Sequence, residues 1–230
     1  MLVLNRSGPI QTMATNEISI PLDGIRLGGE LHLSKTSAAL VLFAHGSGSS
    51  RHSPRNQFVA RVLRQAGLGT LLFDLMTAEE EESEAHTRHL RFDIEFLSRR
   101  LVAATQWVVA QRGNASIGYF GSSTGAAAAL LAAVESGNLI QAVVSRGGRP
   151  DLAGAALERV RPPTLLIVGG DDTEVIALNK TAYARLHCEK AFRIVTGATH
   201  LFEEEGALEQ VATMASEWFA THLTVTATRK

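Results

Sequence analysis

Apolar residues follow two alternating patterns along the chain, short continuous runs and longer stretches in which they recur at helical spacing. Several short runs, such as TLLF and LLIV, have no polar interruption, which is typical of strands that are covered on both faces. Strands that alternate with helices predict a parallel sheet with crossover helices. We therefore expect one α/β domain over residues 1–230, with helices on both faces of a mostly parallel sheet.

The predicted strands begin with a hairpin over residues 17–20 and 25–33, which turns at Asp23-Gly24. The later strands are predicted at residues 39–43, 69–73, 116–120, 142–144, 164–168 and 192–195. Helical spacing predicts helices over residues 56–66, 92–111, 126–135 and 207–222. Asn56 is interpreted as the capping residue of the first helix, and Gly67 as its end.

Three segments fall outside this alternation. Residues 79–84 are rich in Glu, and we expect a solvated loop or the start of a helix there. Residues 146–163 are predicted to hold mainly one helix, so no substantial lid domain is expected and the site should be open. Residues 1–15 are predicted to be a loose leader, since they lack the basic and apolar regions of a signal peptide.

Composition narrows the function classes. Apolar residues make up 45% of the chain and charged residues 20%, as in ordinary globular proteins. The formal net charge of -1 argues against nucleic acid or an anionic membrane as a partner. Cys188 is the single cysteine, which excludes an internal disulfide and a cysteine-based metal cluster. We expect a cytoplasmic protein without metal or organic cofactor, whose oligomeric state the sequence does not indicate.

Gly121-Ser122-Ser123-Thr124-Gly125 is the strongest chemical signal. The G-x-S-x-G pattern is weak alone, but here it follows the apolar strand SIGYF and leads into the helix-forming run AAAALLAA. This strand–turn–helix setting is the one that a nucleophilic serine on a sharp turn requires. We predict strained backbone angles at Ser123, with glycines at 121 and 125 because neighbouring segments pass too close for larger side chains.

A serine hydroxyl needs a base to take its proton as it attacks. Of the eight histidines, His200 follows the last predicted strand and precedes the final helix, and we predict that it is the base. His45 is expected to be structural. The acid that orients the imidazole should follow the 164–168 strand, where Asp171 and Asp172 are both candidates.

Four motifs in order, HGSGSS at 45–50, GSSTG at 121–125, VGGDD at 168–172 and GATH at 197–200, resemble those of α/β hydrolases. Within that fold the resemblance is to dienelactone-hydrolase-like proteins, from about residue 18 to about residue 220. It implies the α/β-hydrolase fold and a triad in the order Ser123, Asp172, His200. The family pattern favours Asp172 because of its position before Val175, with Asp171 bonding backbone amides of its own turn.

The same resemblance implies an oxyanion hole made of the backbone N–H groups of Thr124 and Ser47. One departure matters, because the name-giving dienelactone hydrolases use a cysteine nucleophile where this chain has Ser123. The resemblance therefore favours a general esterase over a lactone-specific enzyme.

The predicted function is hydrolysis of a carboxylic ester of a small acyl substrate through an acyl-serine intermediate. A thioesterase or small-amide hydrolase is an alternative, since the same groups cleave these bonds. A third hypothesis is a catalytically silent protein that binds a ligand or partner. Four arginines in loops at the carboxyl edge of the sheet are candidates for gripping an anionic substrate group, against the alternative of structural pairs: Arg51, Arg55, Arg146 and Arg149.

Overall fold

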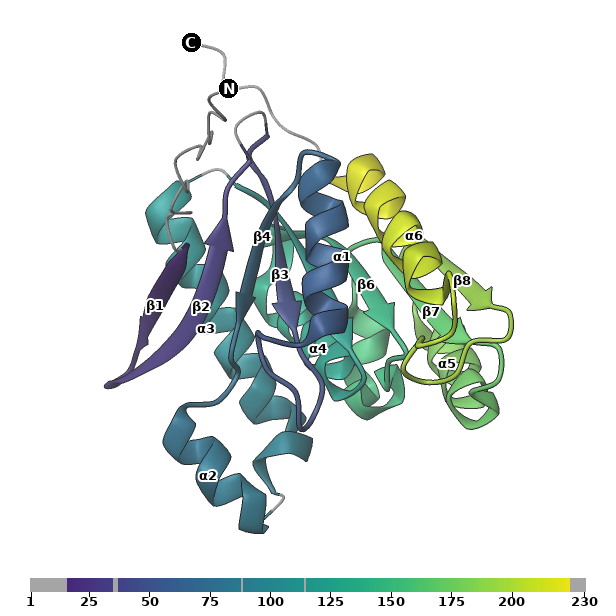
Figure 1. The fold of residues 1–230 in the computed structure, drawn as a ribbon, viewed down its shortest axis with the longest axis horizontal. Helices are drawn as coiled ribbons and strands as arrows, with labels where there is room; N and C mark the ends of the chain where they lie inside the picture. Colours follow the sequence, from purple (N-terminus) through teal and green to yellow (C-terminus); the bar gives the residue numbers. More distant parts are fainter. Residues whose placement is uncertain (1–15, 35–36, 88, 114, 224–230) are drawn as a thin grey trace, which may run out of the picture.

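The computed structural model describes residues 16–34, 37–87, 89–113 and 115–223, and the predicted leader at 1–15 lies outside them. Within this part, strands form one sheet in the order β1-β2-β4-β3-β5-β6-β7-β8 (Figure 1). The strands are β1 (Glu17–Leu22), β2 (Ile25–His32), β3 (Ala39–Ala44), β4 (Gly69–Phe73), β5 (Ser116–Ser122), β6 (Ile140–Arg146), β7 (Thr164–Gly169) and β8 (Lys190–Val195).

The two amino-terminal strands are the antiparallel part of the sheet. β1 pairs with β2, and β2 pairs antiparallel with β4, whereas the pairs from β4 to β8 are parallel. Asp23 and Gly24 turn the hairpin with φ of 39° and 85°, the left-handed angles that a two-residue hairpin loop needs. The predicted hairpin and the mostly parallel sheet are confirmed.

Helices cover both faces of the sheet, as predicted. They are α1 (Pro54–Gln65), α2 (Ala78–Thr87), α3 (Ile94–Arg112), α4 (Thr124–Ser136), α5 (Thr173–Arg185) and α6 (Ala207–His222), with 3-10 turns η1 (Leu90–Phe92), η2 (Gly137–Leu139) and η3 (Pro150–Arg159). α1 and α6 pack side by side on one face, and α3, α4 and α5 on the other (Figure 1). Alternate residues of β3 enter the two cores, Leu40 and Leu42 on one side and Val41 and Phe43 on the other.

Local expectations failed at two helices. Ser53, and not Asn56, caps α1: its hydroxyl accepts the Asn56 N–H at 3.4 Å, and Pro54 occupies the first helical position. α5 was absent from the predicted helices because its buried face, Val175, Asn179 and Ala182, includes a polar residue. Asn179 is fully buried, with its amide bound to the Gly148 and Val175 carbonyls at 2.9 and 2.8 Å.

Two other segments also differ from expectation. The 146–163 segment holds a 3-10 turn that Gly154 breaks, with φ of 55° and ψ of -131°, and it does not form one continuous α-helix. The Glu-rich segment begins helix α2, with Glu79, Glu80 and Glu81 in the first turn, which confirms one of the two expectations. It is not simply solvated, however, because Glu84 is fully buried and accepts the Leu90 N–H at 2.7 Å. Arg91 also binds Glu84, at 2.9 Å, and together these bonds hold the pKa of the Glu84 carboxyl at about 2 despite its burial.

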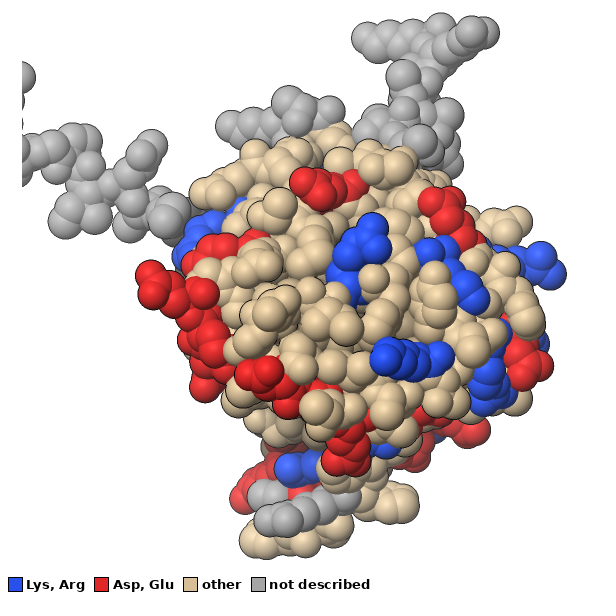
Figure 2. Space-filling model, turned by 90° about the vertical axis from the view of Figure 1, so that its right-hand side faces the viewer, with Lys and Arg blue, Asp and Glu red and all other residues tan. Residues whose placement is uncertain are grey.

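The described surface carries charges of both signs. Basic and acidic side chains are interspersed on the face that Figure 2 shows, which fits the near-zero net charge of the chain. No helix in the part of the chain that the structure describes is long and apolar enough to cross a membrane.

Close packing of α6 on β5 gives a stability test. A Cβ on Gly118 would lie 2.7 Å from a ring carbon of Phe219, so Gly118→Ala should destabilise the protein by about 1–3 kcal/mol. Phe219→Ala should remove about 3–5 kcal/mol by leaving a cavity. In the double variant the added methyl enters that cavity, and chemical denaturation should give a loss smaller than the sum. Strict additivity would contradict this packing.

Candidate active site

Main-chain crowding holds Ser123 on a sharp turn between β5 and α4. Its φ of 50° and ψ of -122° are strained for a residue with a side chain. A Cβ on Gly125 would lie 2.2 Å from the Ala44 carbonyl oxygen, and one on Gly121 would lie 2.5 Å from the Ala126 Cα. The strain at Ser123 and the steric need for both glycines, which were predicted, are present in the structure.

His200 and Asp172 approach the turn from two other loops. His200 Nδ1 lies 2.7 Å from Asp172 Oδ2, and the Asp172 side chain is 14% exposed. Asp172 occupies the N-cap position of α5, yet its carboxylate makes no capping bond and turns to the imidazole instead. A carboxylate accepts only, so this contact places the proton on Nδ1 and leaves the Nε2 lone pair available.

Asp171, the alternative candidate for the acid, makes no side-chain contact with this pair in the described residues. Its side chain is exposed, and its backbone N–H donates to the Ala198 carbonyl at 3.0 Å. Within the described residues its carboxylate accepts no hydrogen bond, so the expected bonds to its own turn are not formed. Of the two adjacent aspartates, the structure brings only Asp172 to His200.

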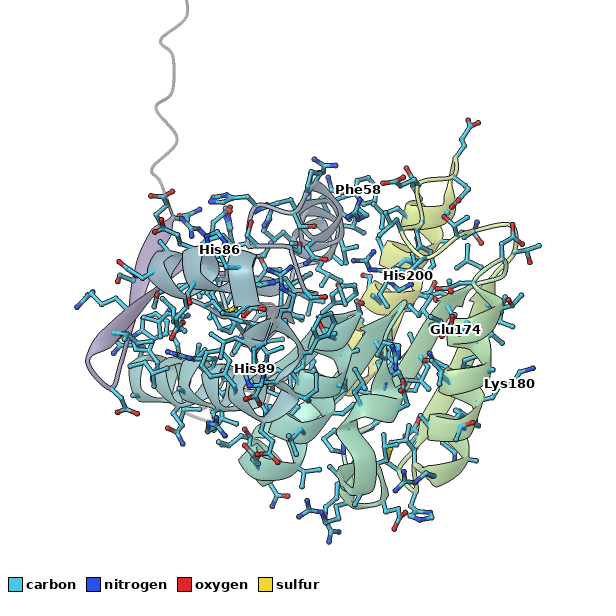
Figure 3. The ribbon with its side chains drawn as sticks, turned by 90° about the horizontal axis from the view of Figure 1, so that it is seen from below. Phe58, His86, His89, Glu174, Lys180 and His200 are labelled. Carbon is cyan, nitrogen blue, oxygen red and sulfur yellow. The ribbon has the colours of Figure 1, made fainter. Side chains whose placement is uncertain are left out.

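His45 has a structural position, as expected. Its ring is buried: Nδ1 donates to the Gly46 carbonyl at 3.0 Å, and Nε2 accepts the Leu75 N–H at 3.1 Å. These bonds tie the loop after β3 to the loop after β4. Burial lowers the pKa of His45 below its ordinary 6.5. Figure 3 looks onto the carboxyl edge of the parallel strands and places His86 and His89 well apart from His200.

The expected oxyanion donors lie together, but one of them is occupied. Thr124 opens α4, so its N–H has no carbonyl acceptor within the helix. The Ser47 N–H, from the HGSGSS loop, donates to Thr124 Oγ1 at 3.0 Å. Ser47 therefore contacts the first turn of α4, with its N–H bound to a hydroxyl, and its role as an oxyanion donor stays a prediction.

A cavity of about 250 Å³ opens at this point, and Ser123 and His200 both line it. No hydrogen bond joins these two side chains within the described residues; such contacts often tighten only when substrate binds. The other lining residues are Gly46, Ser47, Ser49, Ser53, Arg55, Asn56, Ser122, Arg146, Gly147 and Leu201. A larger cavity of about 600 Å³ lies at the opposite edge, before β7 and β8, away from Ser123.

Asn56 and Ser122 are cavity residues that the sequence reasoning missed. Asn56 is buried in the first turn of α1, and its Oδ1 accepts the Ser122 hydroxyl at 3.0 Å. Ser122 was available as the neighbour of the nucleophile. Asn56 gave no signal, because an asparagine near a helix start is usually a cap.

The four candidate arginines separate into two groups. Arg51 is paired with Asp74, and Arg149 with Asp151 at 2.9 Å, and neither lines the cavity. Arg55 and Arg146 do line it. Arg55 is bound to the exposed Glu203 at 3.0 Å, whereas Arg146 is buried and forms no ion pair within the described residues. No cluster of three or more potential metal ligands occurs in the same residues.

Comparison with known proteins places this architecture. No family profile matches the chain. A dienelactone hydrolase from Anabaena variabilis is 54% identical to this chain and superposes on it with a TM-score of 0.89. The match covers 92% of this chain and 99% of that protein's chain. The chain belongs to the dienelactone hydrolase family. XC6422 from Xanthomonas campestris, described as an α/β serine hydrolase without a lid, has a TM-score of 0.74 at 20% identity, over 96% of this chain and 100% of its own.

A Mycobacterium tuberculosis protein provisionally named a phosphoribosyl transferase is 52% identical over 209 residues, which is 90% of this chain. The chain spans 46% of that protein, so it corresponds to about half of its length. The α/β-hydrolase fold, mostly parallel and without a substantial lid, is thus established for this member of the dienelactone hydrolase family.

The lowered pKa of His45 predicts a loss of stability in acid. Below pH 6.5 the unfolded chain takes up a proton at this histidine that the folded protein resists, so the free energy of unfolding should fall as the pH falls. Denaturant titrations between pH 7.5 and about pH 5 should show a weaker fall in His45→Gln than in the parent. The exposed His86→Gln is the control, and equal slopes in all three proteins would contradict the assignment.

Proposed function

We propose that the chain is a serine hydrolase that cleaves a carboxylic ester of a small substrate, with Ser123 as nucleophile, His200 as base and Asp172 as the orienting acid. The 2.7 Å contact between His200 Nδ1 and Asp172 Oδ2 carries the proposal, because the imidazole it orients shares one small cavity with a strained serine. The family membership supports a hydrolytic reaction.

In the proposed reaction Ser123 Oγ attacks the ester carbonyl carbon as His200 Nε2 takes the hydroxyl proton. The tetrahedral intermediate collapses when the C–O bond to the alcohol breaks and His200 returns the proton to the leaving oxygen. A water molecule, deprotonated by the same nitrogen, then attacks the acyl-serine. The bond from the acyl carbon to Ser123 Oγ breaks, His200 returns the proton to this oxygen, and the acid leaves. Asp172 stays ionised throughout and stabilises the imidazolium at each transfer.

The oxyanion of the intermediate would accept the Thr124 N–H and the Ser47 N–H. Donors of this kind are typically worth about 3–4 kcal/mol each to the transition state. For Ser47 to act, Thr124 Oγ1 must give up the 3.0 Å hydrogen bond that it now accepts.

The names of the relatives limit what is carried over. Lactone specificity is not part of the proposal, because Ser123 stands where we expect the name-giving enzymes to use cysteine. Phosphoribosyl transfer is not part of it either, since the chain matches only 46% of the protein with that name. The same steps would cleave thioester and amide bonds. The relative rates on matched ester, thioester and amide substrates would show which of the three bonds the protein cleaves fastest.

A fluorophosphonate probe tests for an activated serine without knowledge of the substrate. We expect one adduct, on the peptide that contains Ser123, located by mass spectrometry. Ser123→Ala and His200→Ala should abolish it. Ser83→Ala and His86→Ala, which alter exposed residues on α2, should label like the parent. A folded parent protein that remains unlabelled would reject the hydrolase in favour of a silent binding protein.

Variants of the adjacent Asp171 and Asp172 form a matched pair that tests which residue is the acid. Asp172→Asn should lower kcat on p-nitrophenyl acetate by about a thousandfold or more, because an amide no longer holds the productive tautomer. Asp171→Asn changes an exposed carboxylate without a partner in the described residues and should stay within about twofold. Equal losses, or a larger loss at Asp171, would reassign the acid.

A further inference from the structure

Arg146 ends β6 beside the nucleophile, and its carbonyl accepts the Ser123 N–H at 3.3 Å. Its side chain runs into the catalytic cavity and is only 6% exposed. Within the described residues, the guanidinium has one weak hydrogen bond, 3.4 Å to Asn56 Oδ1, and its Nε is buried without an acceptor. The Phe202 ring, 5.7 Å from the guanidinium carbon, completes these contacts.

Three other partly buried arginines of the described chain offer a comparison with Arg146. Arg91 is bound to Glu84, Arg100 to Glu80 and Arg51 to Asp74. Each of these cations has a carboxylate, although each is more exposed than Arg146. A buried cation without an anion is strongly disfavoured, and one aromatic ring offsets only part of the penalty.

A second cation, Arg55, adds to the positive charge of the cavity. Arg55 lines the same cavity. Burial, together with the nearness of Arg55, lowers the pKa of Arg146 to about 10, which still leaves Arg146 charged at neutral pH. The one carboxylate in contact with Arg55, Glu203, is 64% exposed at the rim. The Nε of Arg55 is also buried without an acceptor. Within the described residues, Arg55 is thus paired with Glu203, whereas the charge of Arg146 in the same cavity has no carboxylate to neutralise it.

We propose that Arg146, with Arg55, binds an oxyanion group of the substrate, and that the substrates are small acyl esters that carry a phosphate. The proposal rests on the proposed hydrolase only for the reaction, because the anion site itself depends on the charge and burial of Arg146.

Charge and donor chemistry favour phosphate over carboxylate. Glu203, the partner of Arg55, is 64% exposed, so an incoming anion can replace it and then faces two guanidinium groups, whose combined charge matches a dianion. Two serines that also line the cavity, Ser49 and Ser53, add hydroxyl donors for the further oxygens of a tetrahedral group. A volume of about 250 Å³ suits a short acyl chain that spans from Ser123 to this group.

The test uses three p-nitrophenyl esters whose acyl chains of equal length end in a phosphonate, a carboxylate or a methyl ester. For the parent protein we expect kcat/KM to fall in that order, with the phosphonate about tenfold to a hundredfold above the neutral ester, mainly through KM. The preference should persist at 0.5 M NaCl, because a buried pair is weakly screened. Arg146→Met should reduce the ratio to near one, whereas Arg112→Met, on an exposed arginine, should keep it.

Asn56→Asp is a second variant that does not remove the cation. It places a carboxylate where Oδ1 now contacts Arg146, and it should abolish the preference while it satisfies the buried charge. Calorimetry with inorganic phosphate gives a readout independent of turnover. The parent should bind phosphate, and Arg146→Met and Asn56→Asp should bind it at least about tenfold more weakly.

The outcomes separate the two proposals. No preference and no phosphate binding, in a protein that cleaves the neutral ester, would overturn the anion site and leave the hydrolase. A carboxylate preferred to the phosphonate would overturn the assignment to phosphate. Phosphate binding that depends on Arg146, in a protein whose Ser123 resists the fluorophosphonate probe, would uphold the anion site and overturn the hydrolase.

Discussion

Main-chain contact between the turn at Ser123 and the end of β3 constrains the rest of the site. The Gly125 backbone lies so close to the Ala44 and His45 carbonyls that a single added carbon would overlap them. That approach fixes the loop after β3, and with it Ser47, against the first turn of α4. The buried His45, bonded on both ring nitrogens, fastens the other side of the same loop to the segment after β4. Backbone packing at this edge of the sheet therefore fixes the loops that carry the side chains of the site.

Two polar side chains near this edge of the sheet, Asp172 and Arg146, lack the partners that such side chains usually have. Asp172 stands at the N-cap of α5 but leaves the helix uncapped, so its acceptor is available to His200. Within the described residues, Arg146 extends from a strand end into the protein without a carboxylate, whereas Arg91 and Arg100 each have one. Both departures weaken the folded state locally, and both lie within reach of Ser123. Such strain concentrates where a protein binds or reacts.

Apolar pattern alone was enough to predict the strand–helix alternation and the hairpin, because continuous apolar runs leave few alternatives. The elbow could also be predicted, since strand, glycines and helix are contiguous in sequence. Prediction failed where a polar residue is buried by a distant partner: Asn179 bonds to Gly148, and Glu84 to the backbone of η1. Asn56 was misread because its partners, Ser122 and Arg146, lie 66 and 90 residues away. The separation of Arg146 from Arg51 and Arg149 likewise depends on tertiary contacts.

Because the Ser47 N–H donates to Thr124 Oγ1, a substrate oxygen in the proposed oxyanion hole would have to compete with this hydroxyl for the donor. A neutral ester carbonyl is an acceptor of similar strength to a hydroxyl, so a resting substrate gains little by displacing the threonine. A full oxyanion is a much stronger acceptor and wins the same N–H. For a hydrolase working as proposed, this donor therefore distinguishes the transition state from the ground state and contributes to kcat with little effect on substrate affinity.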